Sequence, residues 1–344
     1  MINTNPFIDF GNESNYQIQL GLDLNSLTTL EASFFYSSTP ERERLENIWS
    51  VVSYILSSLY HLAHDLVGTV IVPGFWHSAY EVRNYRMNLL DVNNGNRYKR
   101  ITIEVDGYQI DTLIVMHEDA KRDRWMLVSL GNGDCYEAGC RSFDDLLYQM
   151  GANAVFFNYP GVGSSSGWPN RQAMKNTYLA MLQFLEEKIK AKEVIGYGHS
   201  LGGGVQGDAL CDYEFKSDMQ YVFIKDRTFS NLAAVASSIV HPWIAPLISM
   251  LGWNIDSIES SKKLSCLEVI IQAAHVETPA TSSDVLDDGV ITKEASLASS
   301  LLDLQRSDKI YIGLGSAFMR EHDDPHGDRL SAQIMRRVVS AMFT

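Results

Sequence analysis

Short apolar runs alternate with segments of helical spacing from about residue 98 onward. Asp106-Gly107, between the first two runs, is a hairpin turn signal. The later segments repeat apolar residues at helical spacing and predict helices at about 139–150, Asn170–Ala191, Lys293–Leu302 and Arg329–Phe343. The apolar runs predict buried strands at Arg100–Val105, Gln109–Met116, Trp125–Leu130, Ala154–Asn158, Val194–Tyr197, Tyr221–Lys225, Cys266–Gln272 and Lys309–Leu314. The alternation predicts an α/β fold, with a mostly parallel central sheet and helices on both faces.

Residues 1–95 are predicted to be an N-terminal helical extension to a domain at 96–344. Eight apolar residues between 48 and 66 share one helical face, and Asp65 is the only charged residue between Glu46 and Glu81. This helix either packs on the domain, or it contacts lipid or covers an acyl-binding cleft. Packing is favoured, because lipid-surface helices usually carry Lys and Arg on their polar face. Residues 47–80 remain a candidate for peripheral membrane contact.

The most specific chemical signal is Gly198-His199-Ser200-Leu201-Gly202, which follows a short apolar strand and opens a helix of small residues. A serine in this strand–turn–helix setting is typical of the nucleophile elbow of α/β-hydrolases. Ser200 is therefore the candidate nucleophile, and the alternative is an idle serine in a glycine-rich turn. The Leu201 N–H, at the start of the helix, is a candidate oxyanion donor. Asn132, in the loop after the strand Trp125–Leu130, is the candidate for the second donor N–H, with Gly133 close behind, and the alternative is an ordinary glycine-rich loop.

A serine nucleophile needs a histidine base and an acid that orients it, and in this fold they follow in the order Ser, acid, His. Asp288 is the candidate acid, with Asp287 and Asp284 behind it. Alternatively, Asp288 caps the helix that begins near Thr292. His322 and His326 follow the last predicted strand, and His322 is favoured because His326 lies close to the final helix.

Composition excludes several classes of function. The formal net charge is -14, so there is no basic stripe for nucleic acid. The four cysteines have no paired spacing and the histidines form no ligand pattern, so neither metal, cofactor nor disulfide framework is predicted. The N-terminus lacks the features of a Sec signal peptide, and no segment is apolar enough to span a membrane. A cytoplasmic location is expected, or delivery into a host cell by a dedicated secretion system.

Several segments together resemble single-domain α/β-hydrolases. They are Leu130–Gly133, Asn158–Gly167 and Gly198–Gly203, and the closest branch is the Bem46-like one, which includes protein depalmitoylases. Asp226–Leu232 also resembles that branch. The N-terminal extension and Asp288–Ile291 resemble a hydrolase-like family of chlamydiae and other intracellular bacteria. The chain departs from the superfamily pattern at three positions, which are Leu130 before the oxyanion loop, Glu321 before His322, and Thr292 after the acid's apolar pair.

These features predict a serine hydrolase that cleaves an ester or thioester of an acylated lipid or protein through a Ser-His-Asp triad and an acyl-enzyme. The apolar insert Leu232–Trp253 is either a lid or acyl-chain wall, or a helix packed on the flank of the sheet. We expect an apolar acyl substrate. The alternative is a catalytically silent hydrolase-fold binding module that docks to a host protein or a membrane.

Overall fold

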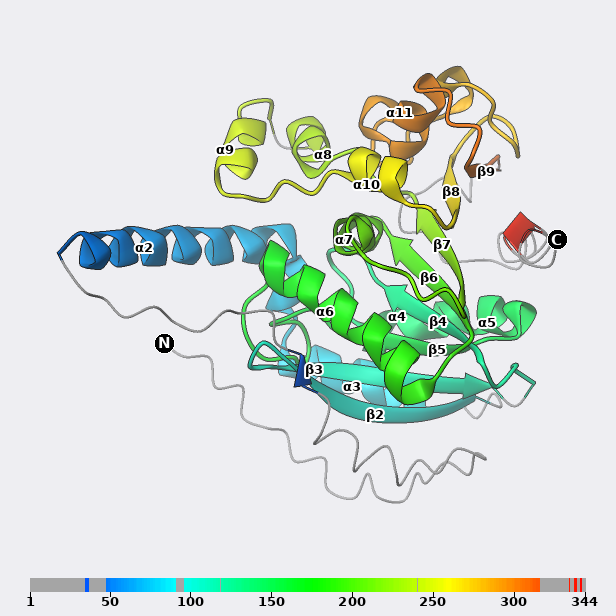
Figure 1. Ribbon diagram of the computed structural model, residues 1–344, viewed down its shortest axis with the longest axis horizontal. Helices are drawn as coiled ribbons and strands as arrows, with labels where there is room; N and C mark the ends of the chain where they lie inside the picture. The colour runs from blue at the N-terminus through cyan, green and yellow to red at the C-terminus, as the bar shows by residue number, and fades with distance from the viewer. Residues whose placement is uncertain are drawn as a thin grey trace.

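The computed structural model describes residues 35–36, 48–90, 96–117, 119–239 and 241–315, together with residues 334, 337, 338 and 341. Within this part of the chain, nine strands form one sheet in the order β1-β2-β3-β5-β4-β6-β7-β8-β9 (Figure 1). They are β1 (Phe35–Tyr36), β2 (Asn96–Val105), β3 (Tyr108–His117), β4 (Arg124–Ser129), β5 (Asn153–Phe157), β6 (Glu193–His199), β7 (Gln220–Asp226), β8 (Leu267–Ala273) and β9 (Ile310–Leu314). All neighbours pair in parallel except β2 with β3 and β3 with β5, which confirms the mostly parallel sheet.

The β2–β3 hairpin forms where the turn signal predicts it. Asp106 and Gly107 have positive φ values of 51° and 81°, as both central residues of a type I′ turn require. Val105 pairs with Tyr108 across this turn. The short strand β1, in contrast, lies in a stretch of the sequence whose pattern predicts no strand.

Helices cover both faces of the sheet. Consecutive residues of β4 alternate between two buried clusters, with Trp125 and Leu127 in the cluster that includes residues of α6 and α7, and Met126 and Val128 in the cluster that includes residues of α5. The helices are α2 (Ile48–Ile71), α3 (Ala79–Leu90), α4 (Tyr136–Gly139), α5 (Asp144–Met150), α6 (Arg171–Gln183), α7 (Leu201–Leu210), α8 (Leu232–Ile239), α9 (Ile244–Met250), α10 (Ser257–Lys263) and α11 (Leu297–Asp303). This two-sided core confirms the predicted layers.

Three predicted helices differ in detail from the structure. The helix at about 139–150 begins earlier and is broken into α4, the 3₁₀ turn η3 (Cys140–Phe143) and α5. The helix predicted at Asn170–Ala191 consists of α6, which is followed directly by a π-helical turn, η4 (Phe184–Ile189). Lys293–Leu302 divides into the 3₁₀ turn η6 (Lys293–Ala295) and α11, because Ser296 between them is extended. Of Arg329–Phe343, residues 334, 337, 338 and 341 are helical, and the rest lies outside the described residues.

The N-terminal helix is present as α2, and Figure 1 shows it projecting beyond the sheet. The short 3₁₀ turn η2 (Pro73–Trp76) and then α3 follow it. No helix in the described part of the chain has the length and apolar character needed to cross a bilayer. The division of the chain at residues 95 and 96 into an extension and a domain stays a prediction.

Candidate active site

Ser200 lies at a sharp junction between β6 and α7. Its backbone has φ 51° and ψ −117°, a combination that residues other than glycine rarely adopt. The Ser200 N–H donates to the Asp226 carbonyl at the end of β7 (2.9 Å), and the Gly203 N–H donates to the Ser200 carbonyl (3.1 Å). These bonds hold the strained turn at the start of α7. Ser200 is 8% exposed, so its side chain is largely shielded from solvent. The backbone geometry is that of a nucleophile elbow.

The glycines around Ser200 are required by close backbone approach. A Cβ at Gly198 would lie 2.6 Å from the Gly203 Cα, so strand and helix could not meet at this angle. A Cβ at Gly202 would lie 2.0 Å from the Ser129 carbonyl oxygen at the end of β4. Because that oxygen belongs to a central strand, it has little room to move.

The carboxyl ends of parallel strands meet at one edge of the sheet, and in this fold that edge is where ligands bind. Ser200 follows β6, the Asn132 loop follows β4, and Asp288 follows β8. Strands β4 and β7 are the two neighbours of β6, and β8 is next beyond β7. The predicted nucleophile, oxyanion loop and acid therefore all leave the sheet at the same edge.

Asp288 is buried and firmly held, with 2% of its surface exposed. Its Oδ1 accepts from the N–H groups of Val290 (3.1 Å) and Ile291 (2.7 Å), and its Oδ2 accepts from Gln272 Nε2 (3.1 Å). The helix-capping alternative for Asp288 is wrong. Thr292 is the N-cap residue of η6, and its hydroxyl accepts from Ala295 N–H.

Asp287 and Asp284, the weaker candidates for the acid, have local roles. Asp287 is exposed, and its Oδ1 accepts from the Lys293 N–H (2.5 Å). Asp284 accepts from the N–H groups of Ala280 and Thr281, and these bonds lower the pKa of its carboxyl below the ordinary value. Neither carboxyl is buried as that of Asp288 is. His322 and His326, the two candidates for the base, lie outside the described residues, as does Glu321.

The predicted oxyanion loop is fixed from both sides. The Asn132 carbonyl accepts from the Gly74 N–H of η2 (3.1 Å), and the Gly133 carbonyl bonds to His77 Nε2 (2.7 Å). Gly131 packs against His199, since a Cβ there would lie 3.2 Å from the His199 Nδ1. Leu201, the other predicted donor, is the first residue of α7. The segment after α2 thus builds one wall of the loop, a contact that the sequence pattern did not predict.

A buried charged cluster lies at the end of β7, next to β6, and sequence reasoning missed it. The Arg227 guanidinium donates to both oxygens of Asp226 (2.9 Å each), and the Tyr197 hydroxyl donates to Asp226 Oδ2 (2.6 Å). All three side chains are buried. Burial alone would lower the pKa of Arg227, but the Asp226 carboxylate and, more weakly, Asp288 raise it above its ordinary value. The adjacent Asp-Arg pair at the end of an apolar strand was the available signal.

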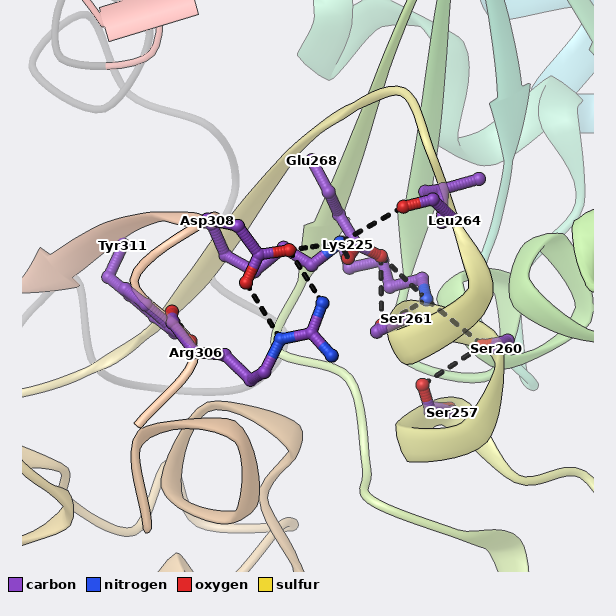
Figure 2. Close-up of polar contacts among 10 residues, drawn as sticks. Lys225, Ser257, Ser260, Ser261, Leu264, Glu268, Arg306, Asp308 and Tyr311 are labelled. Atoms are coloured by element: carbon purple, nitrogen blue, oxygen red, sulfur yellow. Dashed lines mark hydrogen bonds and ion pairs between the residues drawn. The ribbon is translucent and has the colours of Figure 1, made fainter. Parts of the chain in front are cut away.

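A second buried ion network braces the strands on the other side of β7. Glu268 of β8 pairs with Lys225 Nζ (2.8 Å) and with Lys309 Nζ (3.0 Å), and Ser261 of α10 donates to the same carboxylate (2.9 Å). Figure 2 shows these contacts between β7, β8 and α10, with Arg306 and Asp308 beside them. Burial raises the pKa of Glu268, but the two ammonium groups outweigh it and leave that pKa below its ordinary value. This network is structural, because all its members are already paired with one another.

No metal site is indicated in the described part of the chain, and the buried Cys135 is not a reactive thiol. No three His, Cys, Asp or Glu side chains there are grouped so that they could hold a metal ion. Burial raises the pKa of the Cys135 thiol to about 12, which makes it a poor nucleophile at neutral pH.

The pattern of a known family matches most of this chain. The family is the Chlamydia CHLPS protein (DUF818) family, and the match covers residues 77–344. The chain belongs to this family. The matched segment of this CHLPS family member contains Ser200, Asp288 and both candidate histidines.

Curated relatives of this CHLPS family member include two kinds of lipase. It is 27% identical to the phosphatidylserine lipase ABHD16A of Homo sapiens over 194 residues, which are 53% of this chain and 33% of that lipase. It is also 27% identical to the lysophosphatidylserine lipase ABHD12 of Danio rerio over 174 residues, which are 49% of this chain and 43% of that lipase. The match thus spans less than half of either lipase.

Solved structures show the fold. An α/β-hydrolase from Vibrio vulnificus superposes with a TM-score of 0.58 at 15% identity, over 88% of this chain and 97% of the other. The Pyrococcus furiosus esterase Pf2001 superposes with a TM-score of 0.52 at 13% identity, over 71% and 91%. This CHLPS family member has the α/β-hydrolase fold.

Proposed function

We propose that this protein is a serine hydrolase that cleaves a carboxylic ester or thioester of an apolar acyl group. The observation that carries the proposal is the strained turn at Ser200, held by the end of β7 and closed by glycines that admit no Cβ. Backbone strain of this kind costs about 1–3 kcal/mol, and it is retained where it serves a site. If the turn had no chemical role, Ser200 could adopt an ordinary backbone conformation and the strain would be released.

The reaction follows from the residues at this edge of the sheet. Ser200 Oγ attacks the acyl carbon while one of the two histidines that follow β9 in the sequence, His322 or His326, takes its proton. Asp288 orients that histidine and stabilises its cationic form. The N–H groups of Leu201 and Asn132 stabilise the oxyanion. The alcohol or thiol leaves with the proton from the histidine, and water, activated by the same base, then releases the acid and restores Ser200.

The substrate class is supported by the relatives and by the insert between β7 and β8. The relatives ABHD16A and ABHD12 are lipases whose named substrates, phosphatidylserine and lysophosphatidylserine, are acyl esters of glycerol phosphate. In this chain α8 and α9 follow the end of β7 beside the Ser200 turn, and they combine buried Leu232, Val235 and Ile248 with exposed apolar residues. Such a surface suits an acyl chain better than a peptide.

The test is turnover of p-nitrophenyl esters of increasing acyl length by the full chain and by Ser200→Ala. We expect kcat/KM to rise with acyl length, and Ser200→Ala to lose activity by about 10⁴-fold or more while its thermal unfolding midpoint is unchanged. His322→Ala and His326→Ala identify the base. The variant that lacks the true base should lose activity by a factor similar to that of Ser200→Ala, and the other variant by only a few-fold. Equal turnover by wild type and Ser200→Ala would refute the proposal. A folded wild type that turns over no ester would favour the binding module instead.

A further inference from the structure

Helix α2 is oriented against expectation, with its apolar stripe facing outward. The stripe repeats at intervals of three or four residues, so its members share one helical face. Each is more than half exposed; they are Ile55, Leu59, Leu62, Leu66 and Val70. Monomeric proteins rarely leave an apolar row of this kind uncovered.

The opposite side of α2 holds the helix on the body. His64 stacks on Trp253 with ring centroids 4.9 Å apart, its Nδ1 bonds to the Leu251 carbonyl, and Trp253 Nε1 donates to the His64 carbonyl (3.2 Å). Gly68 lies so close to Pro169 that a Cβ would be 1.7 Å from its carbonyl oxygen. The outward direction of the stripe is therefore built into the fold, because turning the helix would break each of these contacts.

Exposed apolar side chains also lie beyond α2, on η2 and α3 and on the insert between β7 and β8. Trp76 of η2 and Tyr80 of α3 are exposed, at 68% and 73%, and η2 also bonds to the Asn132 loop through Gly74. On the insert, α9 ends directly before the Leu251–Trp253 segment that contacts α2. This insert adds exposed Ile239, Trp243 and Met250. Figure 1 shows α9 above α2 in this view, with α8 next to α9.

We propose that this surface, formed by the α2 stripe with Trp76, Tyr80, Ile239, Trp243 and Met250, docks on a phospholipid bilayer. The choice of a lipid rests on the proposed function, because an acyl-lipid substrate resides in such a bilayer. The protruding helix presents a ridge, which fits a bilayer surface, and exposed Trp and Tyr suit the membrane interface.

Charge on the same surface decides between a bilayer and a second copy of the chain. Two copies would each carry a formal net charge of -14, which opposes self-association. Asp65 is the only charged residue between Glu46 and Glu81, and it is half-buried. Binding is therefore driven by apolar burial and needs no anionic lipid, unlike binding by a basic amphipathic helix.

The experiment measures flotation of the full chain with vesicles of phosphatidylcholine, with and without added phosphatidylserine. The variant Leu59→Asp/Leu66→Asp places two charges on the stripe without touching the packed side of α2. Leu304→Asp is the matched control, since Leu304 is similarly exposed but follows α11, away from α2. We expect wild type and the control to bind phosphatidylcholine vesicles equally. The double variant should lose about 30-fold or more in partition, at an unchanged thermal unfolding midpoint.

The outcomes separate docking from catalysis. Ser200→Ala should float with the vesicles as wild type does, so vesicle binding without ester turnover would refute the proposed function and leave docking standing. Wild type that stays in solution, or a double variant that binds as well as wild type, would overturn docking. So would binding that requires phosphatidylserine and is lost in salt. A wild-type dimer that the double variant dissociates, without vesicle binding, would assign the surface to a second copy instead.

Discussion

Replacing Asp288 by Asn should remove catalysis and leave the fold almost intact. In the variant, the amide oxygen can keep the position of Oδ1 and accept from the N–H groups of Val290 and Ile291. The new amide nitrogen then lies opposite Gln272 Nε2, and both atoms are hydrogen-bond donors. Gln272 can relieve this by turning its own amide, because its Oε1 has no hydrogen-bond partner within the described part of the chain. The turned amide would accept from the new nitrogen.

The magnitude follows from this exchange of donors and acceptors. Three hydrogen bonds to a charged acceptor become neutral ones, each weaker by about 1 kcal/mol, so the free energy of unfolding should fall by about 3 kcal/mol. Asp288→Ala removes the acceptor instead and leaves buried donors unpaired, each at about 1–3 kcal/mol, so it should be far less stable. The loss of activity does not depend on this difference in stability. Asp288→Asn cannot hold the imidazolium or fix its tautomer, and kcat should fall by about 10⁴-fold.

The assay combines thermal unfolding with kcat for a soluble p-nitrophenyl ester. Asp287→Asn is the matched control, because that exposed carboxyl bonds only locally to the Lys293 N–H as far as the structure describes it. We expect the control to stay within a few-fold of wild type in kcat. If Asp288→Asn kept kcat within a few-fold, or if Asp287→Asn lost it, the acid assignment would be wrong.

Three further predictions concern the fold around the site. Gly202→Ala should lower the free energy of unfolding by about 3 kcal/mol or more and abolish activity, because the new Cβ meets a backbone oxygen. Gly139→Ala is the control and should be tolerated, and circular dichroism melts of the two variants test the difference. Burial lowers the pKa of His64, so the stability that its contacts contribute is present above pH 6.5 and lost as the pH falls below it. Thermal melts at a series of pH values should show this loss for wild type and not for His64→Gln. Glu268→Gln leaves two buried ammonium groups without their carboxylate and should lower the free energy of unfolding by about 3–5 kcal/mol. Asp218→Asn, in an exposed ion pair, should change it far less, and equal losses for the two variants in urea titration would contradict the prediction.

The sequence was sufficient to predict the sheet and the nucleophile turn, because both depend on local pattern. Continuous apolar runs identified β4 to β9 within a residue or two, and the strand–Gly–x–Ser–x–Gly–helix order identified the strained residue at Ser200. Asp288 was predicted from its place after a late strand, and its burial and backbone bonds agree with that role. Its part in a triad stays a prediction.

What the sequence could not predict depends on contacts between distant segments. The helical spacing identified α2, and the favoured interpretation was a helix packed on the domain. The spacing did not show which side packs, and the long apolar side chains are exposed instead. The side of α2 that packs is selected by His64 and Gly68, whose partners Trp253 and Pro169 are more than a hundred residues away. The pairing of Arg227 with Asp226 likewise required the sheet register, since either side chain could have faced solvent.

The most direct test of the central claim is the intact mass of the folded protein after exposure to a fluorophosphonate. Wild type and Ser200→Ala should be treated in parallel. If Ser200 is an activated nucleophile, wild type gains the mass of one adduct and Ser200→Ala gains none. Two folded proteins that both remain unmodified, or that both gain the same adduct, would contradict the account.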